Sequence, residues 1–303
     1  MPFAEVTREK SKLRLALAGV SGAGKTLSAL YIAYGITGDW SKIALIDTEH
    51  GRAKFYANRS DLHTGTFLYQ EMTPPYAPER YMAMVSEGAA AVGPDGVVIV
   101  DSFSHAWNNE GGVLDIKAEI EKKPGKNSYT AWSDAGRYQT SLVNTVLAVN
   151  CHTIVTMRVK MEYAMEQNDR GKMQPVKIGL APVQRDDTEY EFDIVLNINR
   201  DHTAFASKDT TFLDKWSGII TPEIGSSLKD WLDNGVEPEI CENCGKRIVP
   251  AQNRTVAQIA EGTLKAYGKK MCWSCMAKEI HNRKAVTANA ASTIPGGVGA
   301  ASA

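Results

Sequence analysis

The residues best suited to hold a phosphate group lie near the N-terminus, in the segment Gly19-Val20-Ser21-Gly22-Ala23-Gly24-Lys25-Thr26. This segment fits the pattern G-x-x-x-x-G-K-[ST] in full. Glycines let the backbone turn back so that successive N–H groups converge on a phosphate, and the N-terminus of a following helix adds positive potential. We expect the whole segment to bind a nucleoside triphosphate. In this reading Lys25 reaches the β- and γ-phosphates, and the Thr26 hydroxyl ligates Mg²⁺.

Two acidic residues at the ends of apolar runs are candidates for the chemistry of the triphosphate. Asp101 ends the run Val-Val-Ile-Val-Asp at 97–101 and could hold Mg²⁺, although an acid there could also cap the following turn. Hydrolysis also needs a group that orients the attacking water. The residue after Asp101 is Ser102 and not a glutamate, so another acid must have this role. We predict that it is Glu49, in the run Ile-Asp-Thr-Glu-His at 46–50, with Asp47 as the alternative.

The nucleotide is expected to be ATP. GTP-binding proteins of the phosphate-loop class read guanine with a segment of the form N/T-K-x-D, and the sequence contains none. The predicted cofactors of this site are therefore ATP and Mg²⁺.

Strands and helices alternate around these residues. Short, largely apolar runs predict strands at residues 13–18, 43–47, 66–69, 97–101 and 153–157, and the longer stretches between them predict helices at 26–35, 78–92 and 134–149. A hairpin is expected from 192–198 and 203–207. Continuously apolar strands separated by helices favour an α/β fold with a mostly parallel sheet covered on both faces. Residues 111–132 and 158–185 do not follow this alternation of strands and helices and are expected to be long loops, either functional or mobile.

Four of the five cysteines form two Cys-x-x-Cys pairs, Cys241/Cys244 and Cys272/Cys275, which 27 residues separate. Two such pairs can present four thiolates to one Zn²⁺ ion in a closed tetrahedral site, which would be structural rather than catalytic. Between the pairs, Thr255 to Gln258 reads as a capping box, and an apolar stripe follows until Gly268. A redox dithiol is the alternative. Cys151, in an apolar context, is expected to be a buried small side chain.

Composition limits the remaining classes. The 303 residues carry 34 Lys and Arg against 35 Asp and Glu, which excludes a uniformly basic nucleic-acid coat. No run of 18 apolar residues and no secretory signal is found, so we expect a cytoplasmic protein without a membrane partner. We predict an ATPase domain at residues 1–235, a zinc-ribbon-like module at 236–283, and a disordered tail at 284–303.

Taken together, the phosphate loop, the Asp-Thr-Glu-His segment at 47–50 and the Val-Asp-Ser segment at 100–102 resemble the ATPase core of RecA-type recombinases. In that family the glutamate activates water and the aspartate holds Mg²⁺, so the resemblance implies these roles for Glu49 and Asp101. It also places Thr156 or Arg158 at the family's nucleotide-sensing strand end. Residues 158–193 resemble phage-encoded, core-only AAA/RecA-like ATP-binding proteins, which are associated with single-strand annealing and recombination.

The resemblance implies single-stranded DNA as partner and a ring or filament of identical subunits, in a bacterial host cytoplasm. In such assemblies a basic residue of one subunit completes the site of its neighbour, and Lys208 is the candidate. Cationic segments with aromatic residues suit single strands. We predict DNA contacts from one cationic stretch, with Tyr163 as a stacking side chain; its members are Arg158, Lys160, Arg170, Lys172 and Lys177. The lysine-bearing segment 111–132 is a second candidate face, and a solvated loop is the alternative to both.

The predicted function is thus Mg²⁺-dependent ATP hydrolysis coupled to single-stranded DNA in phage recombination, annealing or replication. Two alternatives stay open at this point. The chain could be a phosphate-loop kinase of small molecules, or a non-hydrolysing, nucleotide-gated module whose zinc unit docks a single-stranded DNA-binding or replication protein.

Overall fold

The computed structural model describes residues 7–167 and 173–291. The chain divides into two compact units, one formed by residues 11–233 and the other by residues 1–10 together with 234–303. The larger unit contains the phosphate loop and both candidate acids, and the smaller unit contains the four paired cysteines.

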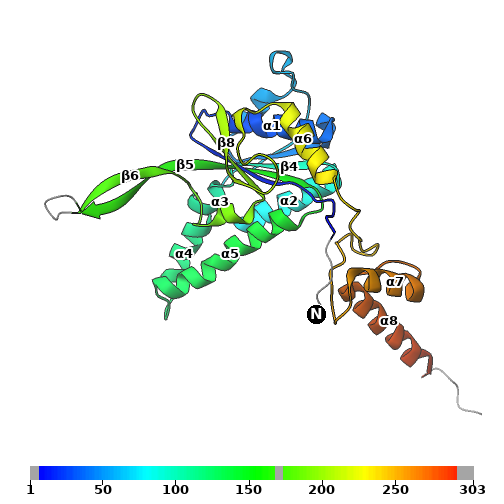
Figure 1. Ribbon diagram of the computed structural model, residues 1–303. Coiled ribbons are helices and arrows are strands. Elements are labelled where there is room, and N and C mark those ends of the chain that lie inside the picture. Colours follow the sequence, from blue (N-terminus) through cyan, green and yellow to red (C-terminus); the bar gives the residue numbers. More distant parts are fainter. Residues whose placement is uncertain (1–6, 168–172, 292–303) are drawn as a thin grey trace, which may run out of the picture. The chain divides into compact units, whose positions relative to one another are not determined.

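A single sheet organises the larger unit (Figure 1). Within the described residues it has nine strands, in the order β3-β2-β4-β5-β1-β7-β8-β9, with β6 paired to the outer part of β5. The pairs among β1, β2, β3, β4, β5 and β7 are parallel, whereas β6, β8 and β9 pair in antiparallel fashion. The strands are β1 (Arg14–Gly19), β2 (Ile43–Asp47), β3 (Leu68–Glu71), β4 (Val97–Asp101), β5 (His152–Gln167), β6 (Met173–Pro182), β7 (Ile194–Ile198), β8 (Thr203–Asp209) and β9 (Ser217–Ile219).

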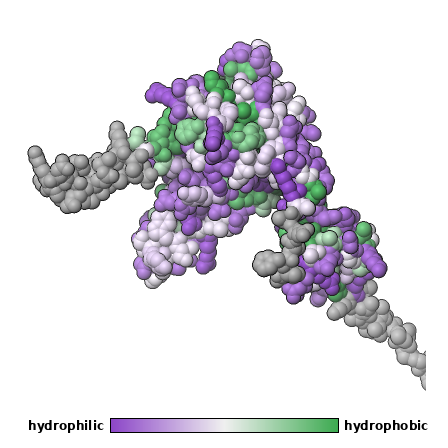
Figure 2. All heavy atoms as spheres, viewed as in Figure 1, coloured by the Kyte–Doolittle hydropathy of each residue, from purple (hydrophilic) through white to green (hydrophobic). Residues whose placement is uncertain are grey.

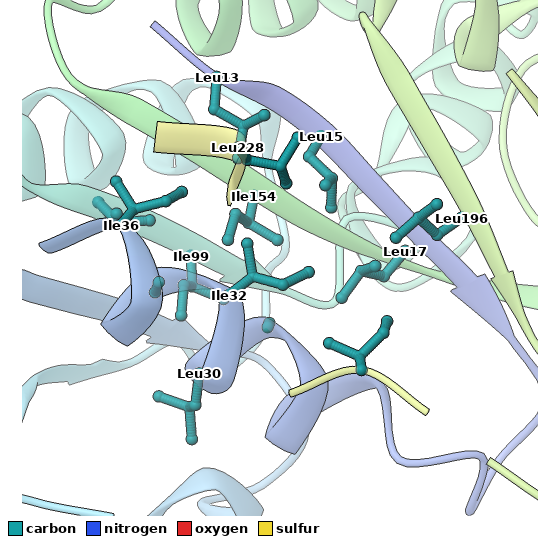
Figure 3. Packing of buried hydrophobic residues seen from close by; sticks show 14 of the residues in the cluster. Leu13, Leu15, Leu17, Leu30, Ile32, Ile36, Ile99, Ile154, Leu196 and Leu228 are labelled. Atoms are coloured by element: carbon teal, nitrogen blue, oxygen red, sulfur yellow. The ribbon is translucent and has the colours of Figure 1, made fainter. Parts of the chain in front are cut away.

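Helices cover both faces of this sheet, and each face has its own core. On one face, leucines of β1 pack against α1 and α6; on the other, Ala16 and Ala18 pack against side chains of α2 and α5 (Figure 3 shows the first core). Because side chains of a strand alternate between faces, a strand with apolar residues throughout is buried on both sides. The helices are α1 (Lys25–Thr37), α2 (Pro78–Val92), α3 (His105–Asn108), α4 (Val113–Glu121), α5 (Ser128–Ala148) and α6 (Pro222–Asp233). Short 3-10 turns are η1 (Trp40–Lys42), η2 (Arg52–Tyr56), η3 (Ser60–Leu62) and η4 (Thr188–Glu191).

The contact between α1 and α6 depends on glycine. A Cβ atom at Gly35 would lie 1.9 Å from the carbonyl oxygen of Pro222, and one at Gly225 would lie 2.3 Å from that of Ile32. The two helices therefore approach backbone to backbone, which fixes α1, and with it the phosphate loop, against the sheet. The visible face of this unit is largely hydrophilic or of intermediate hydropathy, with smaller hydrophobic patches (Figure 2).

The predicted fold class is confirmed: the structure is α/β with a mostly parallel sheet between helices. The strands expected at 43–47 and 97–101 and the helix expected at 78–92 are found with those bounds. The register aligns Asp47 with Asp101 across β2 and β4, and Gly19 with Arg158 across β1 and β5. The carboxyl ends of these strands therefore meet at one edge of the sheet.

The two expected loops are instead built of regular structure. Residues 111–132 contain α4 and the start of α5, whose first turn carries a capping box between Asn127 and Thr130. Of residues 158–185, the described stretches 158–167 and 173–182 form the long two-stranded ribbon of β5 and β6 (Figure 1). Apolar residues alternate with polar ones at 159–163, which is the period of a strand, so the sequence contained a signal for a strand at this position.

The ends of the chain also differ from the expected boundaries. Helix α8 (Trp273–Ala291) continues past residue 284, where a disordered tail was expected, and its alanines and lysine favour a helix. Residues 292–303 lie outside the described part. Near the N-terminus, Glu9 bridges to Val236, so residues 7–10 belong to the smaller unit and not to the ATPase domain.

A buried histidine at the start of β5 makes the stability of the larger unit depend on pH. The His152 Nδ1 accepts a hydrogen bond from the Leu13 N–H at 3.0 Å, and burial lowers the pKa of His152 to about 3. The unfolded chain takes up this proton near pH 6.5. Between these values the unfolded state binds more protons, so stability is fully present above about pH 6.5 and falls as the pH falls.

We predict that this histidine costs about 2 kcal/mol of unfolding free energy between pH 6.5 and pH 5. In His152→Asn the amide oxygen can still accept from Leu13, and no proton is taken up. The difference in unfolding free energy between the variant and the wild type, measured by urea titration, should shift by that amount across this range. A constant difference would contradict the prediction.

Candidate nucleotide site and cysteine cluster

The phosphate loop connects β1, which ends at Gly19, with α1, which begins at Lys25. Gly22 and Gly24 have φ angles of 80° and 90°, in the left-handed region that glycine adopts without strain. A Cβ atom at Gly19 would lie 2.7 Å from the carbonyl oxygen of Ile198 on β7. Glycine at these positions therefore permits both the turn and its close packing, and the first N–H groups of α1 point into the loop without intrahelical partners.

Lys25 folds over this loop. Its Nζ donates to the carbonyl oxygens of Gly19 and Val20, both at 3.0 Å. Burial lowers the pKa of Lys25, while the charges of Asp101 and Glu49 act in the opposite direction. A lysine ammonium group beside backbone N–H donors is the set of groups that a triphosphate requires.

Asp101 is buried at the end of β4 and receives two hydroxyl groups. The Thr26 Oγ1 donates to its Oδ2 at 2.5 Å, and the Thr156 Oγ1 donates to its Oδ1. Burial raises the pKa of Asp101, and the two threonine bonds and Lys25 counteract this rise. Carboxylate and hydroxyl oxygens side by side are donors that Mg²⁺ prefers, so the residues present fit that ion.

Asp47, the rival of Glu49, has a different environment. Its Oδ1 accepts from the N–H of Glu49 at 2.6 Å, and its Oδ2 accepts from the N–H of Ala53 at 3.0 Å and from the Tyr69 hydroxyl at 3.2 Å. Both oxygens are thus committed to the loop that follows β2. Asp47 holds Glu49 in place and does not offer a free oxygen to the nucleotide.

Glu49 is bound at both oxygens by Arg158. The Arg158 Nε donates to Oε1 at 2.8 Å and its Nη2 to Oε2 at 2.5 Å, a bidentate pair across the carboxyl ends of β2 and β5. Burial acts to raise the pKa of Glu49, but the hydrogen bonds and charge of Arg158 outweigh it and lower that pKa. Glu49 is therefore ionised, as a base must be, but its lone pairs are occupied by the guanidinium.

Two histidines beside this cluster were not recognised from the sequence. The buried His105 bonds Thr48 Oγ1 through Nδ1 at 2.8 Å, and its Nε2 lies 3.8 Å from Glu49 Oε1. His202, in the β7–β8 turn, contacts the loop through Nδ1, 3.1 Å from the carbonyl oxygen of Ala23. The order of the strands in the sheet brings these two histidines to the site, and this order cannot be read from the sequence.

Residues 11–223, most of the chain, match a protein family described as an AAA domain. The chain belongs to this AAA family. With the loop geometry, this shows an AAA-type phosphate-loop NTPase domain. No protein among curated sequences matches the chain.

Two solved structures are distantly similar to this chain. One solved structure, described as an ATPase domain, is 13% identical with a TM-score of 0.40, over 76% of this chain and 86% of that one. The flagellar accessory protein FlaH from Methanocaldococcus jannaschii is 14% identical with a TM-score of 0.35, over 72% and 89% of the two chains. Among the described residues, no helix is long and apolar enough to span a membrane.

The other predicted site residues are dispersed. Arg158 and Lys160 lie at the root of the β5–β6 ribbon, Arg170 and Lys172 lie outside the described residues, and the side chains of Tyr163 and Lys177 are likewise outside them. Lys208 pairs with Val195 on β7, near the amino end of the central strands, and its Nζ donates to the carbonyl oxygen of Tyr190. The structure therefore does not bring Lys208 together with the phosphate loop of its own subunit.

The smaller unit is built around the four paired cysteines. The sulfur atoms of Cys241, Cys244, Cys272 and Cys275 lie within 4.8 Å of one another, and Cys244 and Cys272 are 3.8 Å apart. A tetrahedral Zn²⁺ with Zn–S bonds of about 2.3 Å needs sulfur atoms about 3.8 Å apart, so the cluster fits this metal. Helix α7 (Val256–Tyr267) begins at the Thr255–Gln258 capping box and ends at Gly268, as the sequence predicts. Cys151 is buried in the larger unit, as expected.

Proposed function

We propose that this protein is a Mg²⁺-dependent ATP hydrolase that acts on single-stranded DNA in phage recombination, annealing or replication. One observation carries the enzymatic part: Lys25 and Thr26 at the start of α1, Asp101 at the end of β4 and Glu49 just after β2 converge at one edge of the sheet. A phosphate loop alone would support nucleotide binding, whereas an added buried acid and a second carboxylate support cleavage.

The roles follow from the contacts. The backbone N–H groups of residues 19–26 bind the β-phosphate, and Lys25 leaves the loop carbonyls to contact the β- and γ-phosphates. Thr26 and Asp101 would hold the Mg²⁺, which supplies charge neutralisation on the phosphates. Glu49 orients the attacking water and accepts its proton once a carboxylate oxygen is released from Arg158.

The Arg158 contact also supports coupling to DNA. Arg158 lies where β5 leaves the sheet and enters the ribbon: its N–H donates to Ser104 Oγ at 2.9 Å, and its carbonyl oxygen accepts from the Val183 N–H at 2.7 Å. A strand of DNA that shifts the ribbon would draw the guanidinium away from Glu49. Low turnover without DNA and higher turnover with it is the expected consequence.

The same contact favours a second candidate, the non-hydrolysing, nucleotide-gated module. If Glu49 stays bound to Arg158 in every state, ATP can be held but not cleaved at an appreciable rate. The kinase alternative gains no such support, and it predicts turnover that depends on a small-molecule phosphate acceptor.

The deciding experiment is the steady-state ATPase rate with and without oligo(dT), at about 50 mM and about 200 mM KCl. We expect Mg²⁺-dependent turnover that rises at least several-fold with oligo(dT), and a stimulation that weakens at higher salt because phosphate contacts release counterions. Double-stranded DNA of equal length is the control. Turnover that is absent under all conditions, with saturable ATP binding, would select the nucleotide-gated module instead.

The cysteine unit is proposed to bind one structural Zn²⁺ and to dock a partner in replication, such as a single-stranded DNA-binding protein. The ATPase units are proposed to assemble into a ring or filament in which Lys208 contacts the γ-phosphate of a neighbour. Lys208 lies far along the sheet from its own loop, which agrees with a role between subunits.

A further inference from the structure

A cleft runs along helix α5, beside the segment that follows β6. It has a volume of about 430 Å³. Side chains at intervals of three and four residues share one face of a helix. Six residues of α5 with this spacing line the cleft, and Arg185, which follows β6, completes it. Its lining is Trp132, Ser133, Gly136, Arg137, Thr140, Ser141 and Arg185.

An exposed tryptophan forms one wall of this cleft. Trp132 is 42% exposed, and its ring is offset-parallel to that of Trp107, with centroids 5.9 Å apart and an interplanar angle of 21°. The Lys117 Nζ lies 5.6 Å from the Trp132 centroid. The ring is thus held in position by its neighbours while a large part of its surface faces solvent. A fixed, partly exposed indole is a suitable platform for a planar base.

Among the described residues the arginines of the cleft form no ion pair within 4.0 Å, unlike most lysines of α4 and the following turn, although the charge of Asp134 acts on Arg137. Lys117, Lys122 and Lys126 form ion pairs with Glu121, Glu119 and Asp134 respectively. In the part of the chain that the structure describes, no such pair involves Arg137 or Arg185. Gly136 leaves room between them, since a Cβ there would meet only an Arg185 nitrogen, at 3.8 Å. The hydroxyl groups of residues 133, 140 and 141 add further donors.

A larger cleft of about 860 Å³ adjoins this one and shares Trp132, Gly136, Thr140 and Arg185 with it. It extends to Lys160 at the root of the β5–β6 ribbon, and its far wall carries acids, which are Asp186, Asp187 and Glu191. Acids repel phosphates, so a polyanion is expected to place its phosphates at the two arginines and its uncharged bases along the shared tryptophan wall.

We propose that this α5 cleft binds one unpaired nucleotide of a single-stranded DNA, with the base against Trp132 and the neighbouring phosphates at Arg137 and Arg185. The inference rests on the proposed function, which names single-stranded DNA, and it locates the contact on α5 and not only on the ribbon. A paired base cannot leave its stack without cost, so the cleft discriminates single strands from duplex.

The test is fluorescence anisotropy of a fluorescein-labelled oligo(dT) with the full-length chain. Trp132→Leu should weaken binding about 5- to 100-fold, because base stacking on an aromatic ring contributes that much, whereas Trp132→Phe should restore most of it. Tyr129→Leu is the matched control, since Tyr129 is an 84% exposed aromatic of the same helix that does not line the cleft.

The roles of the two arginines are tested by the salt dependence of oligo(dT) binding. Arg185→Gln and Arg137→Gln should each lower the slope of log Kd against log[KCl] by about 0.7, the value for one phosphate contact on a single strand. Lys122→Gln, which removes a lysine already paired to Glu119, should leave the slope unchanged. Basal ATPase activity and thermal unfolding should match the wild type in all these variants.

The outcomes separate the two proposals. If the wild type binds oligo(dT) but Trp132→Leu and both arginine variants bind as the wild type does, the cleft is excluded and the DNA function stands. If the wild type binds no oligo(dT) at low salt, both are overturned. Should Trp132→Leu unfold, the arginine variants, whose side chains lie at the surface, decide by their salt slopes.

Discussion

Replacement of Glu49 by glutamine should reduce ATP turnover by about 100- to 1,000-fold and leave the Kd for ATP within a few-fold of the wild type. An amide has nearly the shape of the carboxylate but cannot accept the proton of the attacking water, and general base catalysis contributes factors of this size. The measurements are steady-state kcat in the presence of oligo(dT) and equilibrium binding of a fluorescent ATP analogue.

Asp47→Asn is the matched control, since it neutralises the other acid of the same segment. Both Asp47 oxygens accept backbone N–H groups, so an amide nitrogen in one of those places would face a donor. The expected cost is about 1–3 kcal/mol of unfolding free energy, with a smaller effect on kcat than Glu49→Gln has. Loss of turnover in Asp47→Asn with unchanged turnover in Glu49→Gln would move the base to Asp47.

The pairing of Glu49 with Arg158 has a consequence for pH. The guanidinium keeps the pKa of Glu49 below its ordinary value, so the carboxylate is ionised throughout the neutral range. In the proposed mechanism the geometry of the pair, and not the protonation of Glu49, limits turnover until a ligand on the ribbon separates the two side chains.

The sequence predicted those parts of the site that local chemistry determines. The phosphate loop needs glycines at fixed spacing, and an acid after four buried β-branched or aliphatic residues can only lie at a strand end. Asp47 and Asp101 could therefore be placed at one edge of a sheet before its strand order was known. The register that pairs them supports this inference.

The remaining parts depend on contacts between distant segments. The Glu49–Arg158 pair joins residues 109 positions apart, and only the adjacency of β2, β4 and β5 brings them together. His202 reaches the loop because β7 lies beside β1. The prediction for the ribbon was wrong for a different reason: its charged residues, mixed with glycines and prolines, suggested a long loop, although charged and apolar residues alternate at 159–163 in the pattern of a strand.

Loss of one cysteine sulfur should unfold the smaller unit. Among the described residues its buried core is small, so apolar burial is slight without a metal; its members are Cys241, Ile248, Ile259, Ala260, Met271, Cys272 and Cys275. Binding of Zn²⁺ to four thiolates supplies about 10–16 kcal/mol in small zinc domains, more than such a core can provide. We predict one zinc per chain by elemental analysis, and loss of it in Cys272→Ser.

The variant should also lose protection from hydrogen exchange across residues 236–283, because the shared ion would join the two cysteine pairs, which lie on either side of α7 and at the start of α8. Cys151→Ala is the matched control: it removes a thiol from the larger unit and should leave zinc content and exchange unchanged. ATP binding should persist in both variants, since residues 19–26 lie in the other unit. Wild-type protein that carries no zinc and still protects these amides in EDTA would show that the four sulfurs are not a metal site.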